Sequence, residues 1–321
     1  MEVRRVLPRD AIESIDDPTF SNGYDGDPDD RLLVVATGDG PARAYPVLVL
    51  NYHEIVNDVV EGEPVAVTWC PLCGSAVVYD RVVDGQELRF GVSGKLAEDD
   101  LVMYDRETES EWKQSTGACI AGPLRGDQLT VRPASMTTLG RFREAYPDGV
   151  VLDPPEGERR VVSADGPGEG LRVETREIDY SVDHYAEYVS GSWLGSRSRD
   201  DSREWNRTDV AAKEIVLGLA LGGEAIGVPR SSVPDAGVLR LGVGNTDVVV
   251  LEVDETLHGF EDPGFEFEPA GDGRFRADGT TWDGDTGRSD DGRSLTPVPS
   301  RRLFAFAWQA DHGDDSFNLP E

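Results

Sequence analysis

The sequence predicts a mainly β, α+β protein built from two diverged copies of a β-rich unit, with a few short helices. The 321-residue chain contains 36 Gly and 20 Pro, and its apolar runs are short. This composition is typical of many short strands joined by turns rather than of a helical bundle. The same order of runs then recurs in the second half of the chain, which indicates an internal repeat.

Four segments follow from this pattern. Residues 1–30 form a polar N-terminal lead-in, and residues 31–152 form the first β-rich repeat. Residues 153–212 are rich in Pro, Gly, Ser and charge and are predicted to be a connector, before a second, degenerate repeat at residues 213–321. The connector carries an aromatic cluster that is expected to pack over the body of the protein: Tyr180, Tyr185, Tyr188, Trp193 and Trp205.

The first repeat is predicted to be a series of strands with a cysteine-bearing hairpin at its centre. Short apolar runs predict strands at residues 31–36, 42–49, 64–69, 76–79, 87–92 and 101–104. The third and fourth of these form the hairpin, with Cys70 and Cys73 at its tip in a Cys-Pro-x-Cys-Gly turn. Residues 136–146 have helical spacing, with Thr137 or Thr138 as a plausible N-cap.

The second repeat follows the first in register. EIVLGLALGGEAIGVP at residues 214–229 has the shape of RLLVVATGDGPARAYP at residues 31–46, without a gap. An Asp-x-acidic-Thr turn also occurs in both copies, as YDRETE and as WDGDTG. Features kept in both copies are expected to serve the shared fold. The acidic side chains of these turns are therefore predicted to cap local backbone groups: Asp105, Glu107, Asp283 and Asp285.

Residues found in one copy only are the candidates for a binding or catalytic role. The positions of the second copy that correspond to Cys70, Cys73 and His53 carry Val, Thr and Ala. The position that corresponds to Met103 carries Thr, and Cys119 lies in a segment that the second copy lacks. The first copy is therefore predicted to be the working half of the protein.

One interpretation of the cysteine pair is a metal site, because a CPxCG turn between strands has the shape of a zinc knuckle. A structural zinc site usually takes four protein ligands, and the chain has no second CxxC. A two-cysteine, one-histidine set completed by another soft ligand or left open would suit one zinc or copper ion. The candidate partners of Cys70 and Cys73 are His53, Met103 and Cys119.

Two other interpretations remain open. The letters WCPLC resemble the WCxxC of thioredoxin-like proteins, but there the motif opens a helix that lowers the pKa of the first thiol. The residues that follow here, GSAVVYD, are strand-like, so a thiol–disulfide oxidoreductase that uses Cys70 and Cys73 is the second hypothesis. The cysteines could also be small buried apolar residues of a non-catalytic interaction scaffold. His53 could equally be a hydrogen-bonded histidine without a metal.

The charge of the chain limits its partners. There are 62 acidic and 31 basic residues, a formal net charge of −31, and the acidic residues are spread over the whole length. Such a surface is typical of adaptation to a salt-rich cytoplasm, and without a basic stripe nucleic acid is not an expected partner. No apolar run is long enough to span a membrane. The N-terminus also lacks the apolar core of a secretory signal, so a cytoplasmic location is expected.

Six motifs together resemble one known family, the domain of unknown function 3179. The motifs stand in the family's order, as HEIVND at residues 53–58, VTWCPLCGSAVVYDR at 67–81, FGVSGKL at 90–96, LVMYDRETES at 101–110, W-x-Q-S-T-G at 112–117 and GPLRG at 122–126. The family is uncharacterised, so the resemblance implies no activity or substrate. Its pattern matches here at His53, Cys70, Cys73 and Met103, and has no general cysteine at the place of Cys119. The acidic, lysine-poor composition resembles haloarchaeal proteins.

The sequence thus predicts a metal-binding protein with one zinc or copper ion, whose redox activity and catalysis are left open. No substrate follows from the residues.

Overall fold

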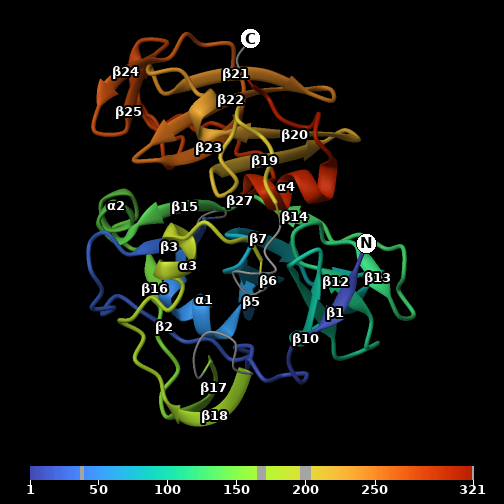
Figure 1. The fold of residues 1–321 in the computed structure, drawn as a ribbon. Coiled ribbons are helices and arrows are strands. Elements are labelled where there is room, and N and C mark those ends of the chain that lie inside the picture. Colours follow the sequence, from blue (N-terminus) through green and yellow to red (C-terminus); the bar gives the residue numbers. More distant parts are fainter. Residues whose placement is uncertain (37–39, 165–170, 196–203, 320–321) are drawn as a thin grey trace.

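Short strands, nearly all of them paired antiparallel, form most of the regular structure of the protein. The computed structural model describes residues 1–36, 40–164, 171–195 and 204–319, and these residues confirm the predicted mainly β class (Figure 1). Parts of the predicted connector, residues 165–170 and 196–203, lie outside the described residues. The four α-helices among the described residues are short: α1 (Val47–His53), α2 (Leu139–Ala145), α3 (Ala186–Ser190) and α4 (Ala305–His312).

A seven-stranded sheet joins the two halves of the chain. Its strand order is β20-β19-β27-β7-β6-β5, and β14 also pairs with β7. The strands are β5 (Ile55–Val60), β6 (Glu63–Cys70), β7 (Ser75–Asp80), β14 (Val131–Arg132), β19 (Ile215–Leu221), β20 (Glu224–Pro229) and β27 (Ser300–Phe304). Val and Leu fill its central strands, and most of these side chains are buried, which supplies much of the hydrophobic stabilisation. The predicted cysteine hairpin is confirmed as β6 and β7.

Two five-stranded sheets complete the N-terminal half. The sheet of order β1-β10-β11-β12-β13 contains β1 (Val3–Arg5), β10 (Phe90–Ala97), β11 (Asp100–Asp105), β12 (Glu111–Lys113) and β13 (Cys119–Ala121). The sheet of order β15-β3-β4-β16-β2 contains β2 (Phe20–Ser21), β3 (Arg31–Val35), β4 (Arg43–Pro46), β15 (Ser135–Thr138) and β16 (Val150–Leu152). The first of these sheets brings β11 beside the cysteine hairpin, because the side chains of both pack in one hydrophobic core.

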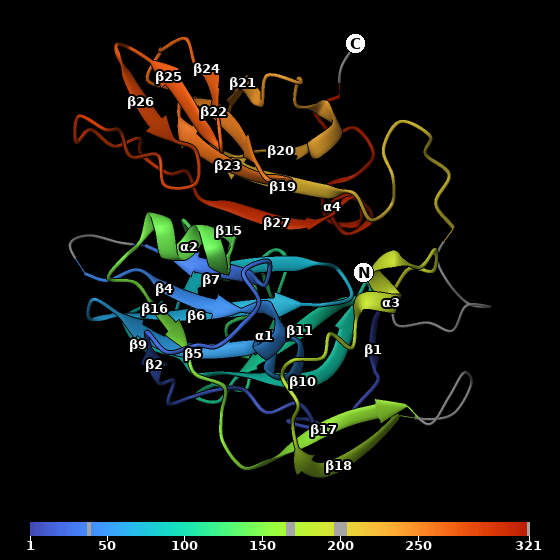
Figure 2. The same cartoon turned by 90° about the vertical axis from the view of Figure 1, so that its left-hand side faces the viewer.

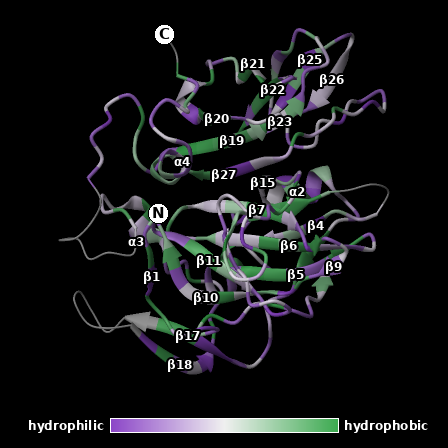
Figure 3. Cartoon of the chain, turned by 90° about the vertical axis from the view of Figure 1, so that its right-hand side faces the viewer, coloured by the Kyte–Doolittle hydropathy of each residue, from purple (hydrophilic) through white to green (hydrophobic). Residues whose placement is uncertain are grey.

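The C-terminal half carries two three-stranded sheets, and the connector carries a hairpin. The sheets contain β21 (Val238–Val243), β22 (Thr246–Val253) and β23 (Thr256–Glu261), and β24 (Glu268–Gly271), β25 (Arg274–Ala277) and β26 (Thr280–Asp283). The connector hairpin is β17 (Glu158–Ala164) with β18 (Leu171–Glu177), and a small hairpin pairs β8 (Val82–Val83) with β9 (Gln86–Glu87). Figure 2 shows the C-terminal sheets at one end of the molecule and β17–β18 at the other. In Figure 3 hydrophobic colour concentrates on inner strands such as β5, β11 and β19.

The two halves use the same order of elements. A hairpin, β3–β4 or β19–β20, is followed by a three-stranded meander, β5–β6–β7 or β21–β22–β23. Late in each half, a strand returns to the first strand of the hairpin and continues into a helix, as β15–α2 and β27–α4. The duplication itself stays a prediction, and this correspondence supports it. Thr138 is the N-cap of α2, as predicted.

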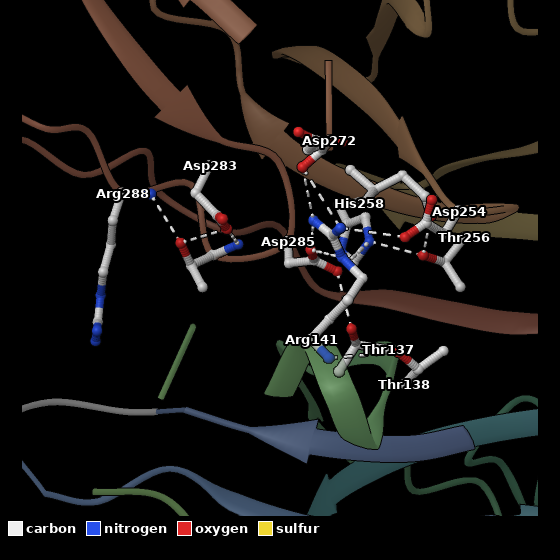
Figure 4. A network of polar contacts seen from close by, with 12 residues as sticks. Thr137, Thr138, Arg141, Asp254, Thr256, His258, Asp272, Asp283, Asp285 and Arg288 are labelled. Carbon is white, nitrogen blue, oxygen red and sulfur yellow. Dashed lines mark hydrogen bonds and ion pairs between the residues drawn. The ribbon is translucent and has the colours of Figure 1, made fainter. Parts of the chain in front are cut away.

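The end of each half reaches the meander of the other. β27 pairs with β7, and β15 contacts β23. Beside β15 a polar network crosses the boundary (Figure 4): Thr137 donates to Asp285 at 3.0 Å, and Arg141 Nε donates to the same carboxylate at 2.6 Å. His258 Nε2 lies 2.9 Å from Thr256 Oγ1 and 3.4 Å from Asp285 Oδ1. Asp285, predicted to cap its own turn, therefore joins the two halves instead.

Of the three other acidic turn residues, two cap their own turns and one does not. Asp105 accepts hydrogen bonds from the main-chain N–H and the hydroxyl of Thr108, at 2.6 and 2.9 Å. Asp283 accepts the equivalent pair from Thr286, both at 2.9 Å. These two carboxylates are the predicted turn caps. Glu107 accepts hydrogen bonds from a neighbouring arginine instead.

The aromatic cluster of the connector packs over the body, as predicted. Tyr188 is part of the main hydrophobic core, and Tyr185, Trp193 and Trp205 pack against it. Tyr180 packs on the neighbouring core and stacks on the ring of a histidine at the end of α1. Among the described residues, the helices fall short of the length and apolarity that crossing a membrane requires.

Candidate metal centre

The tip of the β6–β7 hairpin holds both thiols in one turn. Cys70 ends β6 and is opposite Ser75, which begins β7, so the turn between them contains Cys73 and Gly74. Gly74 has φ +56°, and a Cβ there would lie 2.8 Å from the ring of Phe304. Glycine is needed for both reasons, because other residues rarely adopt this φ and because β27 leaves no room for a side chain.

Three buried ligand atoms converge at this tip. The sulfur atoms of Cys70 and Cys73 and a carboxylate oxygen of Asp100 all lie within 4.8 Å of one another. The two thiols come from the hairpin, and Asp100 begins β11, where the chain turns from β10. Each of the three residues is at most 2% exposed. The structure therefore brings together two thiols and one carboxylate oxygen that could hold a metal ion, all three from buried residues.

Neighbouring elements fix the turn in place. The hydroxyl of Tyr188, on α3, donates to the carbonyl of Leu72 at 2.7 Å. The main-chain N–H of Phe304, on β27, donates to the carbonyl of Cys73 at 2.8 Å. The thiol of Cys73 donates to the carbonyl of Asp99 at 3.4 Å. The connector, the C-terminal half and the turn between β10 and β11 thus all contribute to the position of the sulfur atoms.

One carboxylate oxygen of Asp100 has no partner. Its Oδ2 accepts a hydrogen bond from the main-chain N–H of Ser115 at 2.8 Å, while Oδ1 is buried without a hydrogen bond. Three more side-chain oxygens nearby in the fold are also buried and unpartnered: Ser75 Oγ, Gln114 Oε1 and Ser115 Oγ. Buried polar atoms normally have hydrogen-bond partners, so several unpartnered oxygens in one region need an explanation. A bound metal ion with its waters would supply the missing partners.

Burial governs the protonation of the site. It raises the pKa of the Cys70 thiol, and the hydrogen bond with Cys70 together with burial holds the pKa of the Cys73 thiol well above its usual value. Burial raises the pKa of Asp100 to about 6. Burial and the nearby Asp100 carboxylate raise the pKa of Glu54, which follows α1, to about 8. Without a cation, the site therefore favours protonated thiols.

A cation of the chain lies at the border of the site. Lys113, on β12, forms a buried ion pair with Asp311, on α4, and both side chains are at most 6% exposed. Asp100 and Cys73 also contribute to the electrostatic environment of this lysine. The C-terminal helix thereby supplies a carboxylate to the neighbourhood of the thiols.

The residues present fit a metal ion. Thiolates and a carboxylate are ligands of zinc, and three protein ligands leave a fourth position of a tetrahedral site for water or another molecule. The unpartnered oxygen of Asp100 can serve as a ligand while its other oxygen stays hydrogen-bonded to Ser115. This second-sphere bond would orient the carboxylate.

The histidine predicted as a ligand has other partners. His53, at the end of α1, lies with Nδ1 2.7 Å from the carbonyl oxygen of Glu13 and Nε2 2.7 Å from the hydroxyl of Tyr180. Both ring nitrogens are therefore occupied in the described structure. His53 is not part of the group formed by the thiols and Asp100. This placement agrees with the alternative of a hydrogen-bonded histidine.

The two other predicted ligands lie in the same core as the thiols but outside the group. Met103 is fully buried on β11 and pairs with Trp112 across the sheet. Cys119, on β13, donates its thiol to the carbonyl of Ala121 at 3.4 Å. All three cysteines are free and buried. The structure thus joins Cys70 and Cys73, as predicted, and leaves Met103 and Cys119 as core residues beside them.

Sequence reasoning missed Asp100 and Glu54. Asp100 stands directly before the apolar run of β11. An acidic residue next to a fully buried strand is unusual, but the chain has so many acidic residues that this one did not stand out. Glu54 follows His53 directly in the chain, and no catalytic or metal-binding motif of the sequence marks it. It has φ +57° and is 8% exposed, and its backbone links α1 to the cysteine hairpin, since Trp69 N–H donates to its carbonyl at 2.7 Å.

The fold and this site define a mainly β protein with a buried cluster of two thiols and one carboxylate at a hairpin tip. The model of the family described as "Protein of unknown function (DUF3179)" matches residues 9–315 of the chain. The chain therefore belongs to this family, as the motifs of the first half predicted. Comparisons with curated proteins and with solved structures give no match.

Proposed function

We propose that the protein binds one metal ion, with zinc as the best-fitting ion, through Cys70, Cys73 and Asp100. The observation that carries the proposal is the convergence of three buried ligand atoms within 4.8 Å of one another. The buried oxygen of Asp100 without a partner supports it, because coordination would satisfy that atom. A carboxylate ligand favours zinc over copper(I), which prefers an all-soft set.

The geometry favours this function over thiol–disulfide exchange. An exchanging thiol needs a lowered pKa and access to its partner, and here both thiols are buried and have raised pKa values. A strand follows the second cysteine, so no helix N-terminus stabilises a thiolate. A metal ion would itself favour the thiolates, because binding displaces the thiol protons.

Elemental analysis of the purified protein tests the proposal. We expect about one zinc ion per wild-type chain and a loss of most of it in Cys70→Ser. His53→Gln is the matched control, because it alters another buried residue of the same half, and it should keep the metal. Near-zero metal in the wild type after zinc loading, or equal metal in the wild type and Cys70→Ser, would contradict the proposal.

The charge of the chain supports a second, separate proposal about where the protein works. A net charge of −31 with only three lysines, Lys95, Lys113 and Lys213, is suited to a salt-rich cytoplasm of the haloarchaeal type. In such a medium the mutual repulsion of the carboxylates is screened.

A further inference from the structure

A cavity of about 540 Å³ adjoins the candidate metal centre. Its wall includes Leu72, which lies between the two cysteines, and Leu101, which follows Asp100 in β11. Its size is within the usual range for small-molecule sites, about 300–1,000 Å³. The chain neighbours of Cys73 and Asp100 thus line the cavity.

Elements from three parts of the chain enclose this cavity. The N-terminal segment contributes Ile12, β10 contributes Val92 and Leu96, and β17 contributes Val161 and Val162. In Figures 1 and 2 the β17–β18 hairpin lies below α1 and β10, and residues of both of its strands line the cavity. Aliphatic side chains dominate the lining, so burial of apolar surface would drive binding.

Most polar groups of the lining already have partners. The Asn51 amide donates to Asp183 at 3.0 Å and accepts from an indole N–H at 2.8 Å. The Tyr52 hydroxyl is hydrogen-bonded to His184. The Lys95 ammonium donates to both oxygens of a glutamate, at 2.6 and 2.8 Å. These hydrogen bonds connect the elements that line the cavity. A ligand could use these groups only by breaking them.

Two oxygen-bearing side chains differ from the rest. Glu54, 8% exposed, and Tyr185 both line the cavity, and no described residue forms a hydrogen bond with the carboxyl of Glu54 or the hydroxyl of Tyr185. Both side chains line the same cavity, and burial together with the Glu54 carboxylate raises the pKa of the Tyr185 hydroxyl. Because these two groups line the cavity without a protein partner, a ligand there can hydrogen-bond to them without breaking a contact of the fold.

We propose that this cavity binds an uncharged, largely apolar small molecule that carries one hydrogen-bonding group, held by Glu54 and Tyr185 beside the metal centre. The position beside a metal rests on the proposed function, whereas the binding itself does not. An ion would be a poor ligand, because most of the lining is aliphatic and its two cations, Lys95 and Arg176, are already paired with glutamates.

Displacement of a neutral fluorescent probe tests the proposal. N-phenyl-1-naphthylamine is titrated into zinc-loaded and metal-free full-length protein, and then displaced by 1-naphthalenemethanol or by 1-ethylnaphthalene, which have nearly the same shape. We expect binding of one probe and a preference for the alcohol of roughly 10-fold, the effect of one hydrogen bond. Equal displacement by the two competitors would contradict the role of the polar pair.

Substitutions locate the binding site. Val162→Trp fills the cavity and should weaken probe binding at least about tenfold, whereas Val82→Trp, on an exposed strand away from the cavity, should not. Glu54→Gln keeps a hydrogen-bonding group and should retain the preference for the alcohol. Glu54→Leu should reduce the preference, and Glu54→Leu with Tyr185→Phe should abolish it. Unchanged probe binding in Val162→Trp would overturn the assignment of the cavity.

A spectroscopic measurement separates the two proposals. With cobalt(II) in place of zinc, the alcohol should shift the visible absorption of the ion, because it binds next to the open ligand position. If the protein takes no metal but metal-free chains still bind the probe with the expected preference, the metal proposal fails and the cavity proposal stands. If cobalt binds and the alcohol binds without any spectral shift, the placement beside the metal is wrong.

Discussion

Asp100 stands at the start of β11 with one oxygen held by Ser115 and the other buried without a hydrogen bond. Asp105, at the other end of the same strand, is equally buried but fully engaged with Thr108 and the indole of Trp112. The two carboxylates share a strand and differ in whether the fold satisfies them. This contrast separates a candidate ligand from a structural acid.

Asparagine at position 100 should therefore affect zinc binding, whereas asparagine at position 105 should affect stability. We predict that Asp100→Asn lowers zinc affinity by about 10-fold or more and leaves the stability of the metal-free chain unchanged or higher, because it removes a poorly satisfied buried carboxylate. Asp105→Asn should keep zinc and lower the free energy of unfolding by about 1–3 kcal/mol. Competition with a chelator and urea unfolding measure the two quantities. Wild-type zinc affinity in Asp100→Asn would remove this residue from the site.

The hairpin tip is the element on which the site depends. Gly74 and Gly85 are both turn glycines, with φ of +56° and +79°. A Cβ at Gly74 would press into Phe304, whereas one at Gly85 would meet nothing within 4 Å. Alanine substitutions at these two glycines therefore separate two losses of stability. One comes from the left-handed backbone alone, and the other adds the clash with β27.

We predict that Gly85→Ala costs about 1 kcal/mol of stability, the backbone term alone. Gly74→Ala should cost about 1–3 kcal/mol more, because overpacking is added, and should also weaken zinc binding by moving Cys73. Urea unfolding and chelator competition on both variants test this. Equal losses of stability, with zinc binding intact in both, would show that contact with β27 does not hold the tip.

The contact between β15 and the C-terminal meander contains a buried histidine. Burial lowers the pKa of His258, and its Nδ1 is buried without a partner. The pKa of His258 is therefore lower in the folded than in the unfolded protein. The neutral side chain contributes its full share of the free energy of unfolding above pH ~6.5, and this share is lost as the pH falls through the folded pKa. Protonation would place a charge beside Arg141, although Asp285 and Asp283 offset part of this.

We predict that His258→Gln reduces the acid sensitivity of the fold. In the wild type this residue contributes a slope of at most about 1.4 kcal/mol per pH unit below pH ~6.5. In the variant that part of the slope should vanish, so the two curves of unfolding free energy against pH should converge toward acid. Parallel curves from pH 7.5 down to pH 5 would contradict the assignment.

The whole molecule carries 62 acidic against 31 basic residues, so self-repulsion acts across its surface. Raising KCl from about 0.1 M to about 1 M shortens the Debye length from about 10 Å to about 3 Å. We predict that Tm rises by several degrees over this range, because repulsion between carboxylates is screened. A neutral osmolyte at equal osmolality is the control and should raise Tm less. A Tm that does not respond to KCl would contradict this account of the charge.

The sequence was sufficient for several local elements and for the turn that holds Cys70 and Cys73. The strand predicted at residues 42–49 was wrong beyond Pro46, because α1 begins at Val47. Val-rich runs on both sides of a Cys-Pro-x-Cys-Gly turn indicated the β6–β7 hairpin, and the spacing after Thr138 indicated α2. Cys70 and Cys73 were found because their spacing in one turn is a local property. Local spacing also suggested capping by Asp105 and Asp283, which the structure confirms.

The rest depends on contacts between distant segments. Asp100 reaches the thiols because the β10–β11 hairpin packs against the β6–β7 tip, and no local pattern distinguishes it among so many acids. His53 is only two residues from the start of β5, yet its ring is directed to Glu13 and Tyr180. Asp285 likewise could not be separated from a turn cap before Arg141 was known to lie beside it.

X-ray absorption of the zinc-loaded protein tests the central claim most directly, because it reports the atoms around the ion. A site made by Cys70, Cys73 and Asp100 predicts two sulfur neighbours at about 2.3 Å and oxygen at about 2.0–2.2 Å. Cys73→Ser should lower the sulfur count in any zinc that remains. A shell of nitrogen and oxygen alone, or one of four sulfur atoms, would contradict the account.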